Sequence, residues 1–487
     1  MRTLIKDIVK NEGKRVELAG FVYARRDHGK IIFIDLRDRT GLAQLVFITK
    51  DKALYEKAST LRSEWVIRVE GMVNKRPPAM INKEIPTGEH EMLVESLEIL
   101  AEAVTPPFDV TTDGREIGEE VRMKYRYVDL RRARLHRNLQ LRSKTLAFVD
   151  EYLKAQDFVE VETPILGKST PEGARDYLVP SRLYPGKFYA LPQAPQQYKQ
   201  LLMVAGVERY YQIARCFRDE DTRGDRQPEF TQIDLEMSFI ERDDVLGVLE
   251  GLMIDLVKKE FPEHHITQVP FPRLSYKEAQ EKYGSDKPDL RKDKNDPNEL
   301  AFTWIVDFPF YEWKEENPST SSLLQQASGG QAGRGRWDFV HNTFSMPHGG
   351  TLPDNEKEMG SVLAYQYDLA LNGFEIAGGS IRNHKADLLK KAFMLVGYEE
   401  KAVEEKFGHM MAAFSFGVPP HGGAAIGFDR LMMILLNEPN IREVIAFPKT
   451  GDGRDLMTGA PDEVSAAQLK ELHITIEGAD KLHDKKR

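Results

Sequence analysis

The sequence predicts an α+β protein in which a small five-stranded barrel precedes a larger half built on an antiparallel sheet flanked by helices. Two observations lead to this prediction. Short strands separated by turns fill the first hundred residues, whereas long amphipathic helices mixed with strands begin near residue 135. We therefore expect a barrel domain at 1–104, a hinge at 105–134 and an α+β domain at 135–487.

Five segments with strand character within about a hundred residues are typical of an OB-fold barrel. They are 16–24, 31–36, 42–48, 65–73 and 92–100. In the second segment, alternation places Ile32, Ile34 and Leu36 on one face and Phe33 with Asp35 on the other. An aromatic ring on the outer face of such a barrel favours stacking by an unpaired base, and the alternative is a ring packed beneath a loop.

The boundary between the halves is a Val-Thr-Pro-Pro stretch at 104–107, which breaks regular structure. In the second half, helical periodicity predicts two long helices at 142–156 and 241–260. Strands are expected at 188–191, 209–215 and 230–239. A short polar stretch near 290–300 predicts a surface loop.

Composition excludes several classes of protein. The chain has 77 acidic and 68 basic residues, which argues against sequence-blind binding of nucleic acid, although a local basic face remains compatible. A single cysteine, Cys216, excludes internal disulfides and a multi-cysteine zinc site. No apolar run of about 18 residues and no signal segment occur, so we expect a cytoplasmic protein with no membrane partner.

The segment 216–236 is the richest in chemically active side chains. A strand ends in a charged loop, and the next strand alternates Phe230, Gln232, Asp234 and Glu236 on one face. Polar groups of this kind share a buried face only when ligands or partners satisfy them. The alternative, a charged hairpin in solvent, accounts poorly for the aromatic ring and the ordered polar face.

A second segment contains an Asn-Gly pair, the strongest short hairpin signal, after a strand that carries Asp368. A two-residue turn would pair Ala370 with Glu375 and Asp368 with Ala377. Asp368 and Glu375 then become diagonal neighbours that repel each other unless a cation lies between them, and Mg²⁺ bridging phosphates is the natural candidate. The alternative is one carboxylate paired with Arg382 and no metal.

A third segment is a glycine-rich turn at 422–430 that ends in Arg430 before an apolar helix at 431–436. Glycines let the backbone approach a ligand closely, and a helix start favours anions. Taken alone, this segment indicates a phosphate site only weakly.

Together the three segments resemble motifs 2 and 3 of class II aminoacyl-tRNA synthetases. Phe-Arg-Asp-Glu at 217–220, Arg-Gln-Pro-Glu-Phe-Thr-Gln-Ile-Asp at 226–234, Gly-Phe-Asp-Arg at 427–430 and Gly-Ser-Asp-Lys-Pro-Asp-Leu at 284–290 resemble bacterial-type aspartyl-tRNA synthetases. The likeness covers nearly the whole chain, including the barrel. It implies a ligase that activates L-aspartate with ATP and transfers it from aspartyl-adenylate to tRNA-Asp.

The resemblance also implies roles for individual residues. Catalytic roles fall to Arg218, Glu220 and Arg430. The ATP site would comprise Arg218, Glu220, Gln227, Phe230, Glu375, Gly427, Asp429 and Arg430. Aspartate would be bound by Glu172, Gln196, Lys199, Arg218, Asp234, His341 and Arg382, and Mg²⁺ by Asp368 and Glu375. The anticodon would be read by Arg26, His28, Phe33, Gln44, Ala79 and Glu91.

The choice of amino acid has a physical argument within this resemblance. Lys199 and Arg382 would clamp a side-chain carboxylate, and asparagine would leave both cations unpaired. Asp234 would take the substrate ammonium, and Glu172 would close over it. Neither asparaginyl- nor lysyl-tRNA synthetase specificity explains this pair of cations.

Two positions bear on the choice of tRNA. Strict family members tend to have leucine at the position of His28 and often lysine at that of Ala79, so this chain resembles members that charge both tRNA-Asp and tRNA-Asn. Such an enzyme requires an amidotransferase partner. Glu-Thr-Pro at 162–164 resembles motif 1, which implies a homodimer.

The chain departs from the family pattern in two places. The usual bacterial insertion domain is reduced to the loop near 290–300, and the paired histidines of the family are His341 and Asn342 here. Two other functions remain open at this stage. One is an aspartate–ammonia ligase without tRNA, and the other is a non-catalytic tRNA-binding paralogue.

Overall fold

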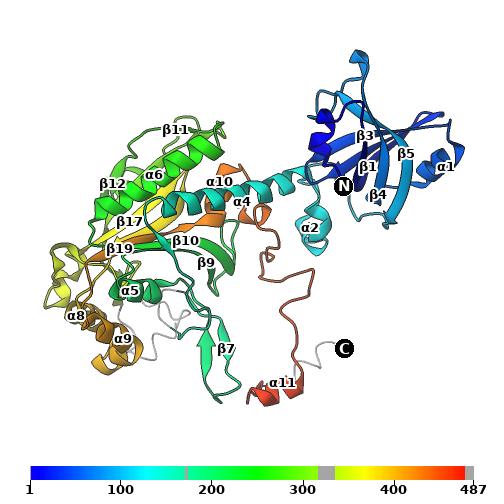
Figure 1. Cartoon of the computed structure of the whole chain (residues 1–487). Helices are drawn as coiled ribbons and strands as arrows, with labels where there is room; N and C mark the ends of the chain where they lie inside the picture. Colours follow the sequence, from blue (N-terminus) through cyan, green and yellow to red (C-terminus); the bar gives the residue numbers. More distant parts are fainter. Residues whose placement is uncertain (1, 170–173, 316–334, 478–487) are drawn as a thin grey trace. The chain divides into compact units, whose positions relative to one another are not determined.

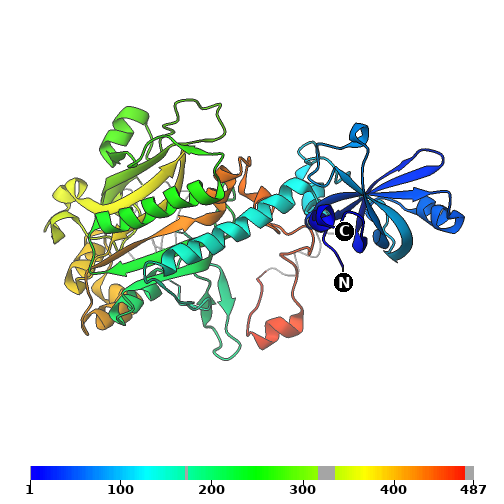
Figure 2. The same cartoon turned by 45° about the horizontal axis from the view of Figure 1, so that its top comes forward.

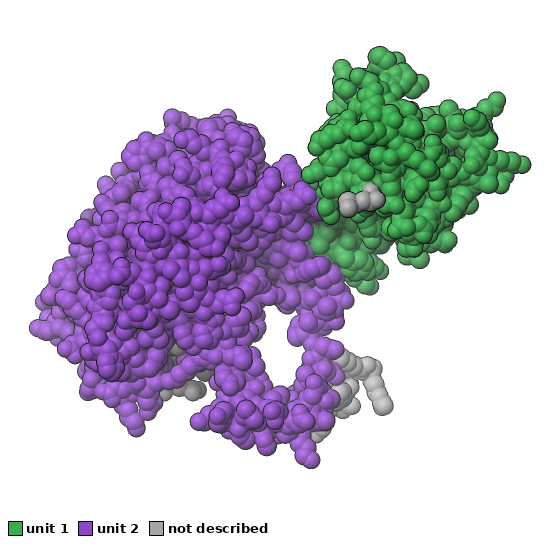
Figure 3. Space-filling model, in the orientation of Figure 1, with its two compact units in different colours: residues 1–133 green, residues 134–487 purple. Residues whose placement is uncertain are grey.

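The computed structural model describes residues 2–169, 174–315 and 335–477. The chain divides into two compact units, residues 1–133 and 134–487 (Figure 3). No helix among the described residues is both long and apolar enough to cross a membrane.

Unit 1 contains a closed barrel with the strand order β1-β2-β3-β5-β4. The strands are β1 (Arg15–Asp27), β2 (Ile31–Asp38), β3 (Gly41–Ile48), β4 (Val66–Lys75) and β5 (His90–Ala101). The five predicted strands are therefore confirmed. All neighbours are antiparallel except β3 and β5. Ile32, Ile34 and Leu36 are fully buried in the barrel core, which leaves Phe33 and Asp35 on the outer face as predicted.

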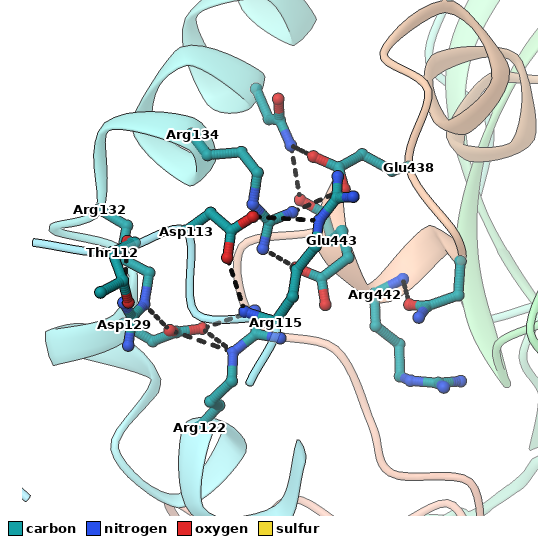
Figure 4. Close-up of polar contacts among 12 residues, drawn as sticks. Thr112, Asp113, Arg115, Arg122, Asp129, Arg132, Arg134, Glu438, Arg442 and Glu443 are labelled. Carbon is teal, nitrogen blue, oxygen red and sulfur yellow. Dashed lines mark hydrogen bonds and ion pairs between the residues drawn. The ribbon is translucent and has the colours of Figure 1, made fainter. Parts of the chain in front are cut away.

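Shorter elements complete unit 1. They are η1 (Ile5–Lys10), α1 (Lys52–Thr60), η2 (Pro78–Met80), α2 (Glu119–Lys124) and α3 (Arg126–Asp129). The segment after the barrel is held by Asp129, whose buried carboxylate accepts hydrogen bonds from Arg122, Arg126 and Arg132 (Figure 4 labels Arg122 and Arg132). A fully buried carboxylate of this kind is stable only because cations surround it.

Unit 2 is built on an eight-stranded sheet with the order β12-β14-β17-β18-β19-β10-β9-β6. Its strands are β6 (Val159–Glu160), β9 (Arg209–Phe217), β10 (Glu229–Ser238), β12 (Arg273–Ser275), β14 (Phe302–Pro309), β17 (Leu363–Leu371), β18 (Phe374–Ile381) and β19 (His421–Gly427). The inner strands are antiparallel, as predicted, and the two edge pairs β6/β9 and β12/β14 are parallel.

One face of this sheet packs against helices α4 (Ala133–Lys154), α6 (Arg242–Glu260) and α10 (Phe428–Leu435). Figures 1 and 2 show α4 and α6 running across it. Ile233, Leu235 and Met237 of β10 join this core, so the alternate residues of the same strand face the other side. Arg134 ties the first turn of α4 to Glu438 and Glu443 at 2.6 and 2.9 Å (Figure 4).

Further elements of unit 2 lie outside this sheet. They are β7 (Leu178–Pro180), β8 (Phe188–Ala190), α5 (Gln196–Val204), β11 (His265–Ile266), α7 (Tyr276–Tyr283), β13 (Glu299–Leu300), β15 (Tyr311–Lys314), β16 (Arg336–Phe339), η3 (His348–Gly350), η4 (Glu356–Ser361), α8 (Ala386–Leu395), α9 (Glu400–Phe414), η5 (Ile441–Glu443) and α11 (Ala466–Glu471). The polar stretch before β13 is a compact loop because Glu299 accepts the backbone N–H groups of Lys292 and Asp293 at 2.9 and 2.8 Å.

Candidate active site

A cavity of about 480 Å³ opens on the face of the sheet opposite to α6. It gathers residues from β10, β17, β18 and β19 with others from α5, α10, the loop 218–227 after β9 and the segment 340–344. The predicted site residues that line it are Gln196, Lys199, Arg218, Glu220, Gln227, Phe230, Asp234, His341, Asp368, Glu375, Arg382, Gly427, Asp429 and Arg430. Glu172 lies outside the described residues.

The inner end of the cavity is a buried cluster of two cations and two carboxylates. Lys199 Nζ lies 2.7 Å from Asp234 Oδ1 and 3.3 Å from Glu236 Oε2. Arg382 donates to both oxygens of Glu236, at 2.8 and 3.1 Å, and to Ser380 Oγ at 2.9 Å. The two predicted carboxylate-binding cations therefore already face acidic partners. The solvent-exposed hairpin considered for this segment is wrong, since Asp234 and Glu236 are fully buried.

The pKa values of the two carboxylates in this cluster are shifted in opposite directions. Burial raises the pKa of Asp234 more than Lys199 lowers it. Burial also acts to raise the pKa of Glu236, but Arg382 and Lys199 together outweigh it and the pKa is lowered. The second oxygen of Asp234, Oδ2, is buried without a hydrogen-bond partner. A buried hydrogen-bond acceptor without a partner favours the binding of a cationic group.

The other end of the cavity carries an aromatic ring and arginines. The guanidinium carbon of Arg218 lies 5.1 Å from the centre of the Phe230 ring. Glu220 forms an ion pair with Arg226 at 3.6 Å. Gln227 accepts the backbone N–H of Lys449 at 2.7 Å, whereas its own amide nitrogen is buried without a partner.

Arg430 lies in the first turn of α10, where helix N–H groups favour anions. It forms an ion pair with Asp225 at 3.0 Å and also contacts the carbonyl oxygen of Glu375. Asp429 has a different orientation, because it pairs with Arg142 of α4 at 2.5 Å and accepts the backbone N–H of Thr231 at 2.8 Å. Asp429 therefore links β10 to α4, and its carboxylate is already occupied.

The acidic hairpin has an irregular register. Ala370 pairs with Glu375 as predicted, but Asp368 pairs with Gly378, so the predicted pairing with Ala377 is wrong. The physical reason is a bulge between Leu369 and Ala370, which adds one residue on β18. Both carboxylates still approach the same point, because a Cβ on Gly378 would lie 3.0 Å from Asp368 Oδ1 and 3.5 Å from Glu375 Oε1.

The closeness of Asp368 and Glu375 affects the pKa of Asp368. Burial and the neighbouring charge of Glu375 raise the pKa of Asp368 well above its usual range. The alternative of a pair between one of them and Arg382 is wrong, because Arg382 binds Glu236. Two carboxylates that border the space beside Gly378 offer the oxygen ligands that Mg²⁺ prefers together with phosphates.

His341 and Asn342 also line the cavity. The His341 ring is exposed and meets Phe308 edge-on with 5.2 Å between ring centres. Asn342 Nδ2 lies 3.5 Å from Gln196 Oε1, and its own oxygen accepts the backbone N–H of Phe344 at 2.8 Å. The two positions at which the family has paired histidines, His341 and Asn342 in this chain, therefore both line the cavity.

The outer face of the barrel in unit 1 carries a ladder of polar contacts across four strands. Arg26 donates to Asp35 at 2.6 and 2.9 Å and to Gln44 Oε1 at 3.2 Å. Gln44 Nε2 donates to Glu91 at 2.8 Å, and Arg76 lies 3.7 Å from Glu91. This ladder orients the Gln44 amide before any ligand binds.

Phe33 occupies the same face, opposite Arg26 in the register of β1 and β2. The ring of His28 meets it edge-on at 5.6 Å between centres. Ala79 lies in η2 and is exposed. The face thus combines an aromatic platform with fixed hydrogen-bonding groups, which is the chemistry of a reader of single-stranded bases.

Sequence reasoning placed Glu236 and Asp35 on the correct faces but gave them no role. It missed Asp225, Arg76, Gln200 and His421 altogether. Alternation within β10 and β2 already separates Glu236 and Asp35 from the core residues of their strands. No local pattern points to the four residues that were missed, because their partners are distant in the sequence.

An OB-type barrel and an antiparallel sheet with this cavity define a class II tRNA synthetase. Residues 118–451 match the family model of class II tRNA synthetases (D, K and N), and residues 16–100 match an OB-fold nucleic-acid-binding domain. The chain therefore belongs to the class II tRNA synthetases of the D, K and N group.

Similar proteins agree with this family. An aspartate–tRNA(Asp/Asn) ligase of Rubrobacter xylanophilus is 41% identical over 96% of this chain and 95% of its own length. One of Dehalococcoides mccartyi is 39% identical over 96% and 98%. The first alignment extends over 589 residues, more than the 487 of this chain, so that relative contains residues with no counterpart here.

Solved structures show the same fold. The asparaginyl-tRNA synthetase of Pyrococcus horikoshii, complexed with asparaginyl-adenylate, has a TM-score of 0.69 at 23% identity over 91% of this chain and 96% of that chain. The aspartyl-tRNA synthetase of Entamoeba histolytica has a TM-score of 0.69 at 21% identity over 92% and 91%.

Proposed function

We propose that the chain is an aspartate–tRNA ligase that activates L-aspartate with ATP and charges both tRNA-Asp and tRNA-Asn. The single observation that carries the choice of amino acid is the buried cluster of Lys199, Arg382, Asp234 and Glu236 at the inner end of the cavity. The family and the names of the similar proteins support the same reaction.

Aspartate fits this cluster by charge. Its ammonium would bind the free Oδ2 of Asp234, and its side-chain carboxylate would bind Lys199 and Arg382. Lys199 and Arg382 contact Asp234 and Glu236 before the amino acid binds, and the side-chain carboxylate of aspartate would be shared between the two cations. Asparagine lacks this negative charge, so its amide would not form the same charge-assisted hydrogen bonds.

ATP would lie along the other end. Phe230 would stack on the adenine ring, Arg218 would bind the α-phosphate, and Glu220 and Gln227 would contact the purine. Arg430 at the start of α10 would bind the γ-phosphate. Asp368 and Glu375 would hold Mg²⁺, and the ion, when bound, would neutralise charge on the phosphates.

Catalysis then rests on positioning and electrostatics. The α-carboxylate of aspartate attacks the α-phosphate in line, and pyrophosphate leaves while Arg218 and Arg430 stabilise the developing negative charge. The 3′ hydroxyl of tRNA next attacks the aspartyl carbonyl, and AMP leaves. Neither step requires a protein nucleophile.

A homodimer and a further partner belong to this proposal. Val159, Ile165 and Leu166 at the β6 edge are 51%, 49% and 53% exposed, which is the surface expected of an interface. Aspartyl-tRNA-Asn is not a finished product, so an amidotransferase would have to convert it. The outer face of the barrel, with His28 and Ala79, supports the charging of both tRNAs.

The test is aminoacylation with radiolabelled aspartate and purified tRNA-Asp or tRNA-Asn. Charging of both supports the proposal. Charging of tRNA-Asp alone leaves the activation chemistry and overturns the dual specificity. Charging of neither, with asparagine formed from aspartate, ATP and ammonia, would instead identify an aspartate–ammonia ligase.

A further inference from the structure

A chain of three buried side chains runs from the amino-acid end of the cavity to the start of β19. Gln196 lines the cavity, and its Nε2 lies 3.0 Å from Gln200 Oε1. Gln200 Nε2 lies 3.0 Å from His421 Nε2, and His421 Nδ1 lies 2.9 Å from the carbonyl oxygen of Pro419. Gln200 and His421 are fully buried and Gln196 is 6% exposed, so water does not compete for these contacts.

The direction of each hydrogen bond in this chain of side chains follows from the Pro419 carbonyl group at its end, because that group cannot donate. The Pro419 carbonyl oxygen only accepts, so the proton of a neutral His421 ring resides on Nδ1. Nε2 of that ring is then an acceptor, and Gln200 must present its amide nitrogen to it. The Gln200 oxygen therefore faces Gln196 and accepts from it, which leaves the Gln196 oxygen as the group directed to the cavity. The Asn342 amide nitrogen, 3.5 Å from that oxygen, fits the same polarity.

We propose that His421 is a positioning residue that acts through Gln200 and sets Gln196 to offer a hydrogen-bond acceptor to the α-ammonium group of the amino acid. This rests on the proposed function. Together with the free oxygen of Asp234, the Gln196 oxygen makes a pair of acceptors for one ammonium group. The relay spans 221 positions between Gln200 and His421, and it links the substrate cavity to the turn before β19.

Protonation of His421 reverses the relay. With a proton on both nitrogens, Nε2 becomes a donor, so the Gln200 amide must rotate to present its oxygen. Gln200 then offers its nitrogen to Gln196, which must turn its own oxygen inward and its NH₂ to the cavity. An NH₂ group facing an ammonium repels it, so aspartate binding weakens on the acid side.

The surroundings of His421 hold it neutral. The ionisable groups that face its ring are Glu236 of β10 and Arg382 and His384 after β18. Burial lowers the pKa of His421, with Arg382 and His384 acting in the same direction and Glu236 against it. The acceptor form of Gln196 is therefore the form present near neutral pH.

The test compares His421→Phe, which keeps an aromatic ring without nitrogens, and His421→Gln, whose amide oxygen can accept from Gln200 but does not titrate. KM for aspartate is measured by ATP–pyrophosphate exchange between pH 4.5 and 8, because burial lowers the pKa of His421 below its ordinary value, with KM for ATP as the internal control. We expect His421→Phe to raise KM for aspartate about tenfold or more at pH 7 to 8, where the wild-type His421 is neutral, as loss of a hydrogen bond to a charged group would. We expect His421→Gln to restore a low KM and to flatten its rise at acid pH.

Each result decides. A folded His421→Phe variant with unchanged KM for aspartate overturns the inference, and so does a His421→Gln variant with the wild-type pH profile. The exposed His341 is unchanged in His421→Gln, so that variant separates the two histidines. If His421→Phe does not fold, the pH profile of His421→Gln decides alone. Absence of aspartate-dependent exchange in the wild type would instead overturn the proposed function.

Discussion

Lys199 Nζ lies 2.7 Å from Asp234 Oδ1 in a fully buried contact, while the other oxygen of the same carboxylate has no hydrogen-bond partner. One side of Asp234 is thus fixed by the protein, and the other is available to a substrate cation. We predict that Asp234→Asn lowers kcat/KM for aspartate about ten- to hundredfold, which corresponds to the ~1.5–3 kcal/mol of a hydrogen bond to a charged group. KM for ATP should stay within about twofold, and an equal rise in both KM values would contradict this role. ATP–pyrophosphate exchange measures both.

Removal of one carboxylate from the pair Asp368 and Glu375 is expected to change activity and stability in opposite directions. Because burial and Glu375 raise the pKa of Asp368, the folded state binds a proton more tightly than the unfolded chain. Metal-free protein should therefore lose stability as the pH rises from the ordinary carboxyl pKa through the raised one. Asp368→Asn removes this loss and should therefore stabilise the metal-free protein at pH 7, and by more there than at pH 4.5.

The same variant should lose pyrophosphate exchange at ordinary Mg²⁺ concentrations. Urea unfolding in EDTA at pH 4.5 and 7 measures the stability, and a matched Mg²⁺ titration of exchange measures the activity. Gly378→Ala, whose Cβ would lie 3.0 Å from Asp368 Oδ1, should raise the Mg²⁺ concentration required. A variant that is both inactive and destabilised at pH 7 would refute the electrostatic account.

Asp129 carries the polar core at the end of unit 1. Replacement by asparagine leaves Arg122, Arg126 and Arg132 without the carboxylate to which all three donate. We expect a loss of about 3–5 kcal/mol in the free energy of unfolding, the range for breaking a buried ion pair. Chemical denaturation measures it, with the half-buried Asp7→Asn, which loses a surface ion pair with Lys10, as a control that should cost much less. Similar losses in the two variants would rule this role out.

The barrel face should matter to tRNA and not to activation. Phe33→Ala removes the aromatic platform and should lower kcat/KM for tRNA-Asp by roughly 5- to 150-fold, from about 1–3 kcal/mol of base stacking. Pyrophosphate exchange should be unchanged, because the cavity lies in unit 2. Lys52→Ala on α1 is a matched control that leaves both activities intact. Equal effects of Phe33→Ala on both reactions would indicate misfolding instead of lost base contact.

The choice between tRNAs is expected to follow His28 and Ala79. The double variant His28→Leu with Ala79→Lys should lower charging of tRNA-Asn at least tenfold relative to tRNA-Asp, since one altered base contact is worth about 1–3 kcal/mol. Competition between the two purified tRNAs measures the ratio directly. A ratio that does not move would assign the discrimination to other residues of the barrel.

The sequence alone determined much of the fold, because its signals are local. The alternation around Phe33 identified the barrel strand and its outer face, and the Asn-Gly turn placed Asp368 and Glu375 on one face of a hairpin. Periods of two or 3.6 residues and turn chemistry act within a few residues, so they can be read from the sequence. The resemblance of the motifs supplied most of the site residues.

Only the tertiary structure decided how those residues are paired. The bulge beside Ala370 moved Asp368 from Ala377 to Gly378, and no residue type in the hairpin predicts it. Arg382 binds Glu236 across 146 positions and His421 binds Gln200 across 221. Such contacts depend on how strands and helices stack, and an acidic or amide side chain does not by itself specify its distant partner. The sequence therefore determined which groups this protein has, and the packing of the sheet decided which of them are already occupied and which remain open to a substrate.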